Sequence, residues 1–151
     1  MSTFTKGEQM LPVLEACKVN CALFGNHEFG MFFFLFKKSF FFLTINPFFV
    51  SFQDFGLDTL KSFVSRTKFP WLMSNVFLKN TGEPLGGGVI KHIVNHFGVR
   101  VGLIGLIEED WLSTLVLDRT ILHYESFIEV GRSLAKELRT KVNIFIYTFF
   151  Q

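Results

Sequence analysis

The run VNCALFGNHEF at residues 19–29 decides how this chain folds. Its first part, residues 19–24, is short, apolar and typical of a buried strand, and a polar turn follows at once. A helical stripe of apolar residues precedes it over residues 10–17. Helix, short link, buried strand and polar turn form half of a βαβ unit, so we expect an α/β fold. Ligands of open α/β sheets gather beyond the carboxyl ends of strands, where Asn26 and His27 would lie.

Length and composition fit one domain with a substantial core. The chain has 151 residues, of which 49% are hydrophobic and 19% charged. A net charge of +2 is too small to favour nucleic acid or an anionic membrane as a partner. Residues 2–7 are polar and lack the apolar run of a secretory signal, so a cytoplasmic location is the default expectation. Cys17 and Cys21 are expected to be reduced, buried thiols rather than a disulfide or a zinc pair.

The rest of the chain alternates between helical and strand patterns. Asp58 or Thr59 is expected to cap a helix. Residues 99–107 form the return strand of a hairpin that turns at Gly98. The other expected elements are a strand at 69–77, a turn-rich connection at 79–88, the first hairpin strand at 89–97, a helix at 124–141 and a β-prone tail from residue 142.

Several segments match the motifs of one enzyme family. Gly25 to Glu28 reads GNHE, the signature of this family. Gly25 to Phe29 and Asp54 to Gly56 together resemble the family motif GNHEFDFG, which residues 30–53 interrupt in this chain. Three further stretches resemble family elements, namely residues 69–76, 98–106 and 129–138. The chain thus resembles a fragment of a calcineurin-like metallophosphoesterase of the 5'-nucleotidase family, over about residues 2–29 and 54–141.

This resemblance implies part of a four-layer α/β sandwich that binds two divalent metal ions such as Mn, Mg or Zn. It implies a phosphorylated small molecule, such as a nucleotide, as substrate. By position, Asn26 would be a metal ligand through its amide oxygen. His27 would stabilise charge on the phosphoryl group, and Asp54 would pair with His27 and favour its protonated form.

The sequence departs from the family pattern around these residues. Gly30 stands where the family has the Asp that follows the Phe, and Asp54 comes 24 residues later. The family's opening Asp-x-His strand would lie before Met1, and its later histidine ligands would lie after the final helix. Asn26 is then the one metal ligand expected here, and one neutral amide cannot hold two divalent ions. We therefore expect this chain alone to be inactive and to lack the metals.

Residues 30–53 interrupt the family match and are rich in phenylalanine. Ten of the 22 phenylalanines fall between Phe32 and Phe52. A membrane span is disfavoured because Lys37 and Lys38 lie inside the apolar stretch. A family-specific loop would leave a large exposed apolar patch. We favour a translated intron as the origin of residues 30–53, and a similar origin for the tail at residues 142–151, which is expected not to belong to the family.

Other motifs have ordinary interpretations. Gly86 to Gly88 is expected to be a flexible connection, because no Lys-Ser/Thr pair follows as in a phosphate loop. His92 and His96 are expected on one solvated face of a strand rather than at a metal. Glu108 to Asp110 is expected to be a solvated acidic loop.

Three functions remain open at this point. The first is a metal-dependent phosphoesterase in a longer version of the protein. The second is a catalytically inactive, truncated product, in which bare sheet edges favour aggregation. The third is a membrane-attached interaction protein that uses the Phe-rich segment.

Overall fold

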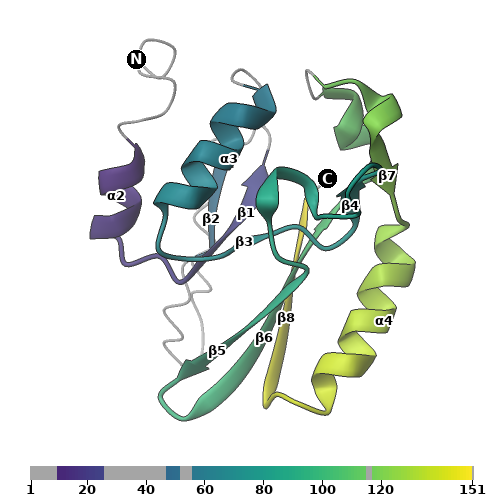
Figure 1. Ribbon diagram of the computed structural model, residues 1–151. Coiled ribbons are helices and arrows are strands. Elements are labelled where there is room, and N and C mark those ends of the chain that lie inside the picture. Colours follow the sequence, from purple (N-terminus) through teal and green to yellow (C-terminus); the bar gives the residue numbers. More distant parts are fainter. Residues whose placement is uncertain (1–9, 26–46, 52–55, 115–116, 151) are drawn as a thin grey trace.

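The computed structural model describes residues 10–25, 47–51, 56–114 and 117–150 (Figure 1). The helices are α2 (Met10–Ala16), α3 (Gly56–Arg66) and α4 (Phe127–Arg139), with 3-10 turns at Leu85–Gly87, Glu109–Thr114 and Arg119–Ile121. The strands are β1 (Cys21–Gly25), β2 (Pro47–Ser51), β3 (Trp71–Leu72), β4 (Val76–Leu78), β5 (Lys91–His96), β6 (Val99–Ile107), β7 (Leu122–Tyr124) and β8 (Ile144–Phe150). Helices and strands are interleaved, which confirms the expected α/β class.

The first sheet is parallel, with β1 between β2 and β3. The side chains of β1 from Cys21 to Phe24 are all buried. Such a continuous apolar run is typical of a parallel strand, which is covered on both faces. In Figure 1, α2 and α3 lie beside this sheet, and Leu14 and Leu60 from these helices join the cluster that contains β1.

Two expectations for this half of the chain are wrong. Cys21 is buried, which raises the pKa of its thiol to about 11, but Cys17 is exposed, because it lies just past the end of α2. Helix α3 begins at Gly56, so Asp58 lies in its first turn rather than at the cap. A carboxylate in the first turn still stabilises the helix through its dipole.

The expected strand at residues 69–77 is divided into two. Trp71 and Leu72 form β3, and Val76 to Leu78 form β4, which pairs antiparallel with β7. The division falls at Ser74 and Asn75, whose side chains bond to other segments and take the chain out of the first sheet. Leu72 also forms a parallel bridge to Val89, after which β5 begins in a different sheet.

The second sheet has the order β5-β6-β8. The β5–β6 hairpin was predicted, and Phe97 and Gly98 form its two-residue turn, with φ of 48° and 81°. Both angles are positive, as in the type I′ turns that suit hairpins. Helix α4 then connects β6 to β8, which pairs parallel with β6 from Val101–Ile144 to Ile107–Phe150.

Successive side chains of β6 serve two clusters on opposite faces of the second sheet. Val101, Leu103 and Ile107 belong to the larger cluster, with residues of β1 and β3. Ile104 and Leu106 belong to a smaller cluster with Leu138 of α4. In Figure 1, α4 covers this second face. Strand β6 therefore lies between α4 and the first sheet.

The predicted insertion and tail both include strands. β2 falls inside residues 30–53, and β8 falls inside residues 142–151. The pairing of β2 with β1 and of β8 with β6 shows how these segments fold. It does not show whether they come from translated introns, so that hypothesis stays a prediction. Within the described ranges, no helix is long and apolar enough to cross a bilayer.

Candidate functional site

The carboxyl ends of β1, β3 and β6 lie at the same edge of the molecule. β1 and β3 are parallel neighbours. Just after β3, the Ser74 amide donates to the Gly105 carbonyl at 2.8 Å, and the Ile107 amide donates to Asn75 Oδ1 at 2.9 Å. As the chain advances from Ser74 to Asn75, the partner on β6 advances from Gly105 to Ile107. The end of β3 and the end of β6 therefore run in the same direction. This edge is where ligands of α/β folds are expected.

The predicted site residues adjoin β1 and α3 in sequence but lie outside the described structure. Asn26 and His27 follow Gly25, the last residue of β1. Asp54 precedes Gly56, the first residue of α3. All three lie outside the described residues, so the roles expected of Asn26, His27 and Asp54 stay predictions.

Asn75 holds the edge together through its side chain. The residue is fully buried. Its Nδ2 donates to the carbonyls of Ile107 at 2.8 Å and Glu125 at 3.0 Å, while its Oδ1 accepts from the Ile107 amide. The Glu125 amide in turn donates to the Asn75 carbonyl at 2.9 Å. Asn75 thus fixes the end of β6 to the segment that leads into α4.

Ser74 makes the corresponding link one residue earlier. Its hydroxyl donates to the Ile90 carbonyl at 2.5 Å and accepts from the Gly105 amide at 3.0 Å. Sequence reasoning missed both Ser74 and Asn75 as determinants of the site. Their signal was present, since two adjacent polar residues interrupt the otherwise apolar run from Phe69 to Leu78.

Gly105 allows the two sheets to approach each other at this point. A Cβ at this position would lie 2.3 Å from Leu23 Cδ1, 2.7 Å from Leu72 Cβ and 3.1 Å from the Leu72 carbonyl oxygen. The absence of a side chain lets β6 lie directly against β1 and β3. The close contact sets the relative position of the three carboxyl ends.

The glycines at residues 86–88 serve packing. A Cβ on Gly88 would lie 2.8 Å from Met73 Cβ and 3.0 Å from the Trp71 carbonyl oxygen. Gly86 is buried, with φ of 71°. These glycines seat the connection against β3 and the Phe24–Trp71 ring stack, whose centroids are 5.1 Å apart. The segment is more closely packed than the flexible connection that we expected.

Acidic residues follow β6 at the same edge. Glu109 and Asp110 are exposed, as expected of a solvated loop, and Glu108 is half-buried. Tyr124 lies nearby, with its hydroxyl accepting from the Phe127 amide at 3.4 Å. Burial, together with Glu109 and Glu108, raises the pKa of Tyr124. Its hydroxyl therefore stays protonated and neutral beside these carboxylates.

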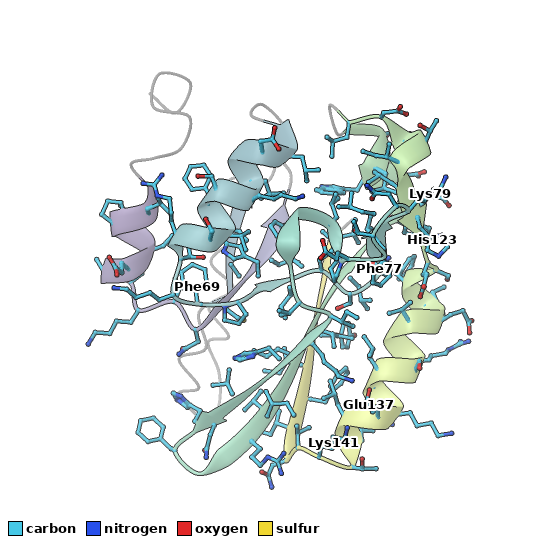
Figure 2. All side chains as sticks on the ribbon, in the orientation of Figure 1. Phe69, Phe77, Lys79, His123, Glu137 and Lys141 are labelled. Carbon is cyan, nitrogen blue, oxygen red and sulfur yellow. The ribbon has the colours of Figure 1, made fainter. Side chains whose placement is uncertain are left out.

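The β4–β7 pair continues the chain beyond this edge, with Phe77 half-buried and His123 exposed. Phe77 and His123 are opposite each other, with ring centroids 6.4 Å apart (Figure 2). His123 Nε2 lies 3.6 Å from Glu125 Oε1. Across the part of the chain that the structure describes, no three His, Cys, Asp or Glu side chains gather closely enough to bind a metal.

His92 and His96 share one face of β5, as predicted, but this face is only partly solvated. Both side chains are half-buried, and burial lowers the pKa of His92. His96 Nε2 is buried and has no hydrogen-bond partner among the described residues. Four residues along a strand span about 13 Å, too far for one ion to bind both rings. The pair is better explained as part of the strand packing than as a metal site.

Comparison with known proteins gives a fold but no closer relationship. No protein-family model matches the chain, and no curated protein matches it significantly. The NAD nucleotidase of Haemophilus influenzae is similar in structure, with a TM-score of 0.62 and 17% identity, over 92% of this chain and 23% of that one. A putative 5'-nucleotidase from Staphylococcus aureus, in complex with alpha-ketoglutarate, gives a TM-score of 0.49 and 20% identity, over 62% and 18% of the two chains.

The similarity to the NAD nucleotidase confirms, at the level of fold, the resemblance inferred from the motifs. This chain spans less than a quarter of the length of either solved structure. The activity and substrates of a whole protein that contains this fold are therefore a matter for proposal.

Proposed function

We propose that this chain is part of the catalytic domain of a metal-dependent phosphoesterase of the 5'-nucleotidase type. The observation that carries the proposal is the shared edge formed by the carboxyl ends of β1, β3 and β6, with the GNHE motif beginning at the last residue of β1. The similarity in fold to a nucleotidase supports the same conclusion. The substrate would be a nucleotide or another small phosphomonoester.

The layer order supports a partial four-layer sandwich. Leu23 of β1 faces Gly105 of β6, and Leu106 of β6 faces Gly131 of α4. Phe24, the next residue of β1, faces Gly86 together with Leu60 of α3. The proposed order is therefore α3, first sheet, second sheet and α4.

The donors of this chain do not fit a dinuclear metal centre. The described residues contain no cluster of three metal-binding side chains. Outside them, Asn26 is the single ligand that the motif supplies, and an amide oxygen brings no charge to offset two divalent ions. In the whole protein, further ligands would have to come from other segments. What this chain would contribute is His27, placed to stabilise phosphoryl charge, and Asp54, placed to orient His27.

The test is to compare this chain with a longer product of the same gene. The longer product would lack residues 30–53 and extend at both ends. We expect it to bind divalent metal and to release phosphate from AMP or p-nitrophenyl phosphate, whereas the 151-residue chain releases none. Transcript sequencing across residues 30–53 establishes whether such a product is made.

Two variants of the longer product separate binding from catalysis. His27→Ala should keep the metal content, measured by elemental analysis, and lose activity. Asn26→Ala should lose metal as well. A longer product that is loaded with metal but inactive on phosphomonoesters would overturn the proposal. If every transcript encodes these 151 residues unchanged, the inactive product is the correct alternative.

A further inference from the structure

The two ends of β6 carry opposite charges among the described residues. At its start, exposed Arg100 lies close to the α4–β8 turn, because its amide donates to Asn143 Oδ1 at 2.9 Å and its carbonyl accepts from the Asn143 amide at 2.8 Å. Arg139 and Lys141 lie in or beside this turn and are also exposed. Glu137 is the acidic residue in this region. It is paired with Lys91 and with Lys141 (Figure 2). We name this end, Phe97 to Arg100 with Arg139 and Lys141, the basic tip.

The opposite end of β6 leads into an acidic surface. Glu109 and Asp110 are exposed directly after it. The Arg119 guanidinium donates to the Glu109 carbonyl at 3.4 Å, which brings the exposed Asp118 and Ile121 into the same region. Ile121 is 40% exposed and adds an apolar contact area. Two exposed cations also lie here, Arg119 and Lys79, whose amide donates to the Ile121 carbonyl at 2.9 Å. With half-buried Glu108, four carboxylates outnumber these two cations, so the surface is acidic overall. We name this surface, Glu109, Asp110, Asp118 and Ile121, the acidic end.

Phe97 projects from the basic tip in a backbone conformation that disfavours it. Its side chain is 89% exposed, and its φ is 48°. A positive φ at a bulky residue is a steric outlier, and hairpin turns of this type prefer Asn, Asp or Gly at that position. Nothing within the described chain offsets this by burying the ring, whose one aromatic contact is the edge of His96 at 4.5 Å. A strained, exposed aromatic residue on a rigid turn has the character of an interface anchor.

We propose that the basic tip of one chain docks on the acidic end of a second copy. The two surfaces lie at opposite ends of β6, about 27 Å apart for eight steps of a strand, so they cannot meet within one chain. Their net charges are opposite, although each surface also carries charges of the other sign, and Phe97 would contact Ile121. Because the two surfaces differ, the contact is head-to-tail and repeats in open chains rather than closing as a symmetric dimer.

The first experiment is sedimentation velocity of the full chain at low salt over rising concentration. We expect a series of oligomers that dissociates at high salt, because exposed charge pairs are screened. Phe97→Asn should leave a monomer at every concentration while raising the unfolding temperature, since Asn tolerates a positive φ. Phe97→Tyr is the matched control and should associate like the original chain. A chain that stays monomeric at low salt, or a Phe97→Asn variant that still associates, would overturn the proposal.

A charge exchange distinguishes this contact from nonspecific aggregation. Arg100→Glu and Glu109→Lys should each be monomeric alone, since each variant opposes like charges at the contact. Mixed in equal amounts, they should associate again, because every junction between unlike variants pairs opposite charges. A mixture that remains monomeric would exclude the head-to-tail contact, as would either variant associating alone.

Discussion

Asn75 uses both ends of its amide to join backbone groups from separate elements. Such a residue cannot be replaced by a smaller or apolar one without leaving buried donors and acceptors unpaired. An unpaired buried polar group costs more than the hydrogen bond contributed. The geometry of the edge formed by the carboxyl ends of β1, β3 and β6 therefore depends most directly on Asn75.

We expect Asn75→Ala to lower the free energy of unfolding by about 3 kcal/mol, because the amide and carbonyl of Ile107 and the carbonyl of Glu125 lose their partners. Urea unfolding followed by circular dichroism measures this as a lower midpoint at constant slope. Asn80→Ala is the control, since Asn80 lies in an exposed turn. A loss similar to that of the control would show that Asn75 is dispensable.

Gly105 supports a second prediction at the scale of single residues. Gly105→Ala places a methyl group within 3 Å of Leu23 and Leu72, so β6 must move away from the first sheet. Overpacking of this kind costs about 1–3 kcal/mol. Gly98→Asn, where no atom lies within 4 Å of a Cβ and φ is 81°, should change stability little. Equal melting temperatures for the two variants would contradict the close approach described here.

Among the elements, those with a clear pattern could be predicted from sequence. β6 was expected at residues 99–107, where it is found, because its apolar run ends at a hairpin glycine and an acidic loop. The division of residues 69–78 into β3 and β4 could not be predicted in the same way. It depends on bonds from Ser74 and Asn75 to residues at least 16 positions away, which local periodicity does not reveal.

The packing of α4 on the second sheet includes an ion-pair network whose effect depends on pH. Glu137 bonds to Lys141 and Lys91, which lowers the pKa of its carboxyl to about 2. The folded pKa lies below the unfolded value, so the network stabilises the fold above about pH 4.3 and loses its effect as pH falls toward 2.

We therefore expect Glu137→Gln to melt at a lower temperature than the original chain at pH 7 and low salt. The difference in melting temperature should shrink as pH falls from 5 to 2, and should also shrink in high salt, because the side chain of Glu137 is 37% exposed and open to screening. Arg132→Gln serves as the control, since its partner Glu129 belongs to the same helix. A difference that grows on acidification would have the wrong sign for this network.

At the scale of the whole molecule, the candidate site was less predictable than the fold. The GNHE motif pointed to the end of β1, and the structure brings the ends of β3 and β6 to the same edge. Asn26, His27 and Asp54 lie outside the described residues, so their mutual geometry remains a prediction. The tail at residues 142–151 shows the same limit. Its β-prone composition predicted a strand, but did not predict that this strand pairs with β6.

The tail therefore provides a test of the whole molecule. β8 pairs with β6 from Val101 to Ile107, and Val142 and Phe145 pack with the α4 cluster. Removing residues 142–151 would leave β6 with one unpaired edge and would uncover Ile104 and Leu138. We expect the shortened chain to lose cooperative unfolding, to bind a hydrophobic dye and to aggregate. Tyr147→Ser, which keeps the backbone pairing and changes a side chain that is 65% exposed, should unfold like the original chain. Cooperative unfolding of the shortened chain would show that the tail adds nothing to the fold, as the hypothesis of a foreign origin would allow.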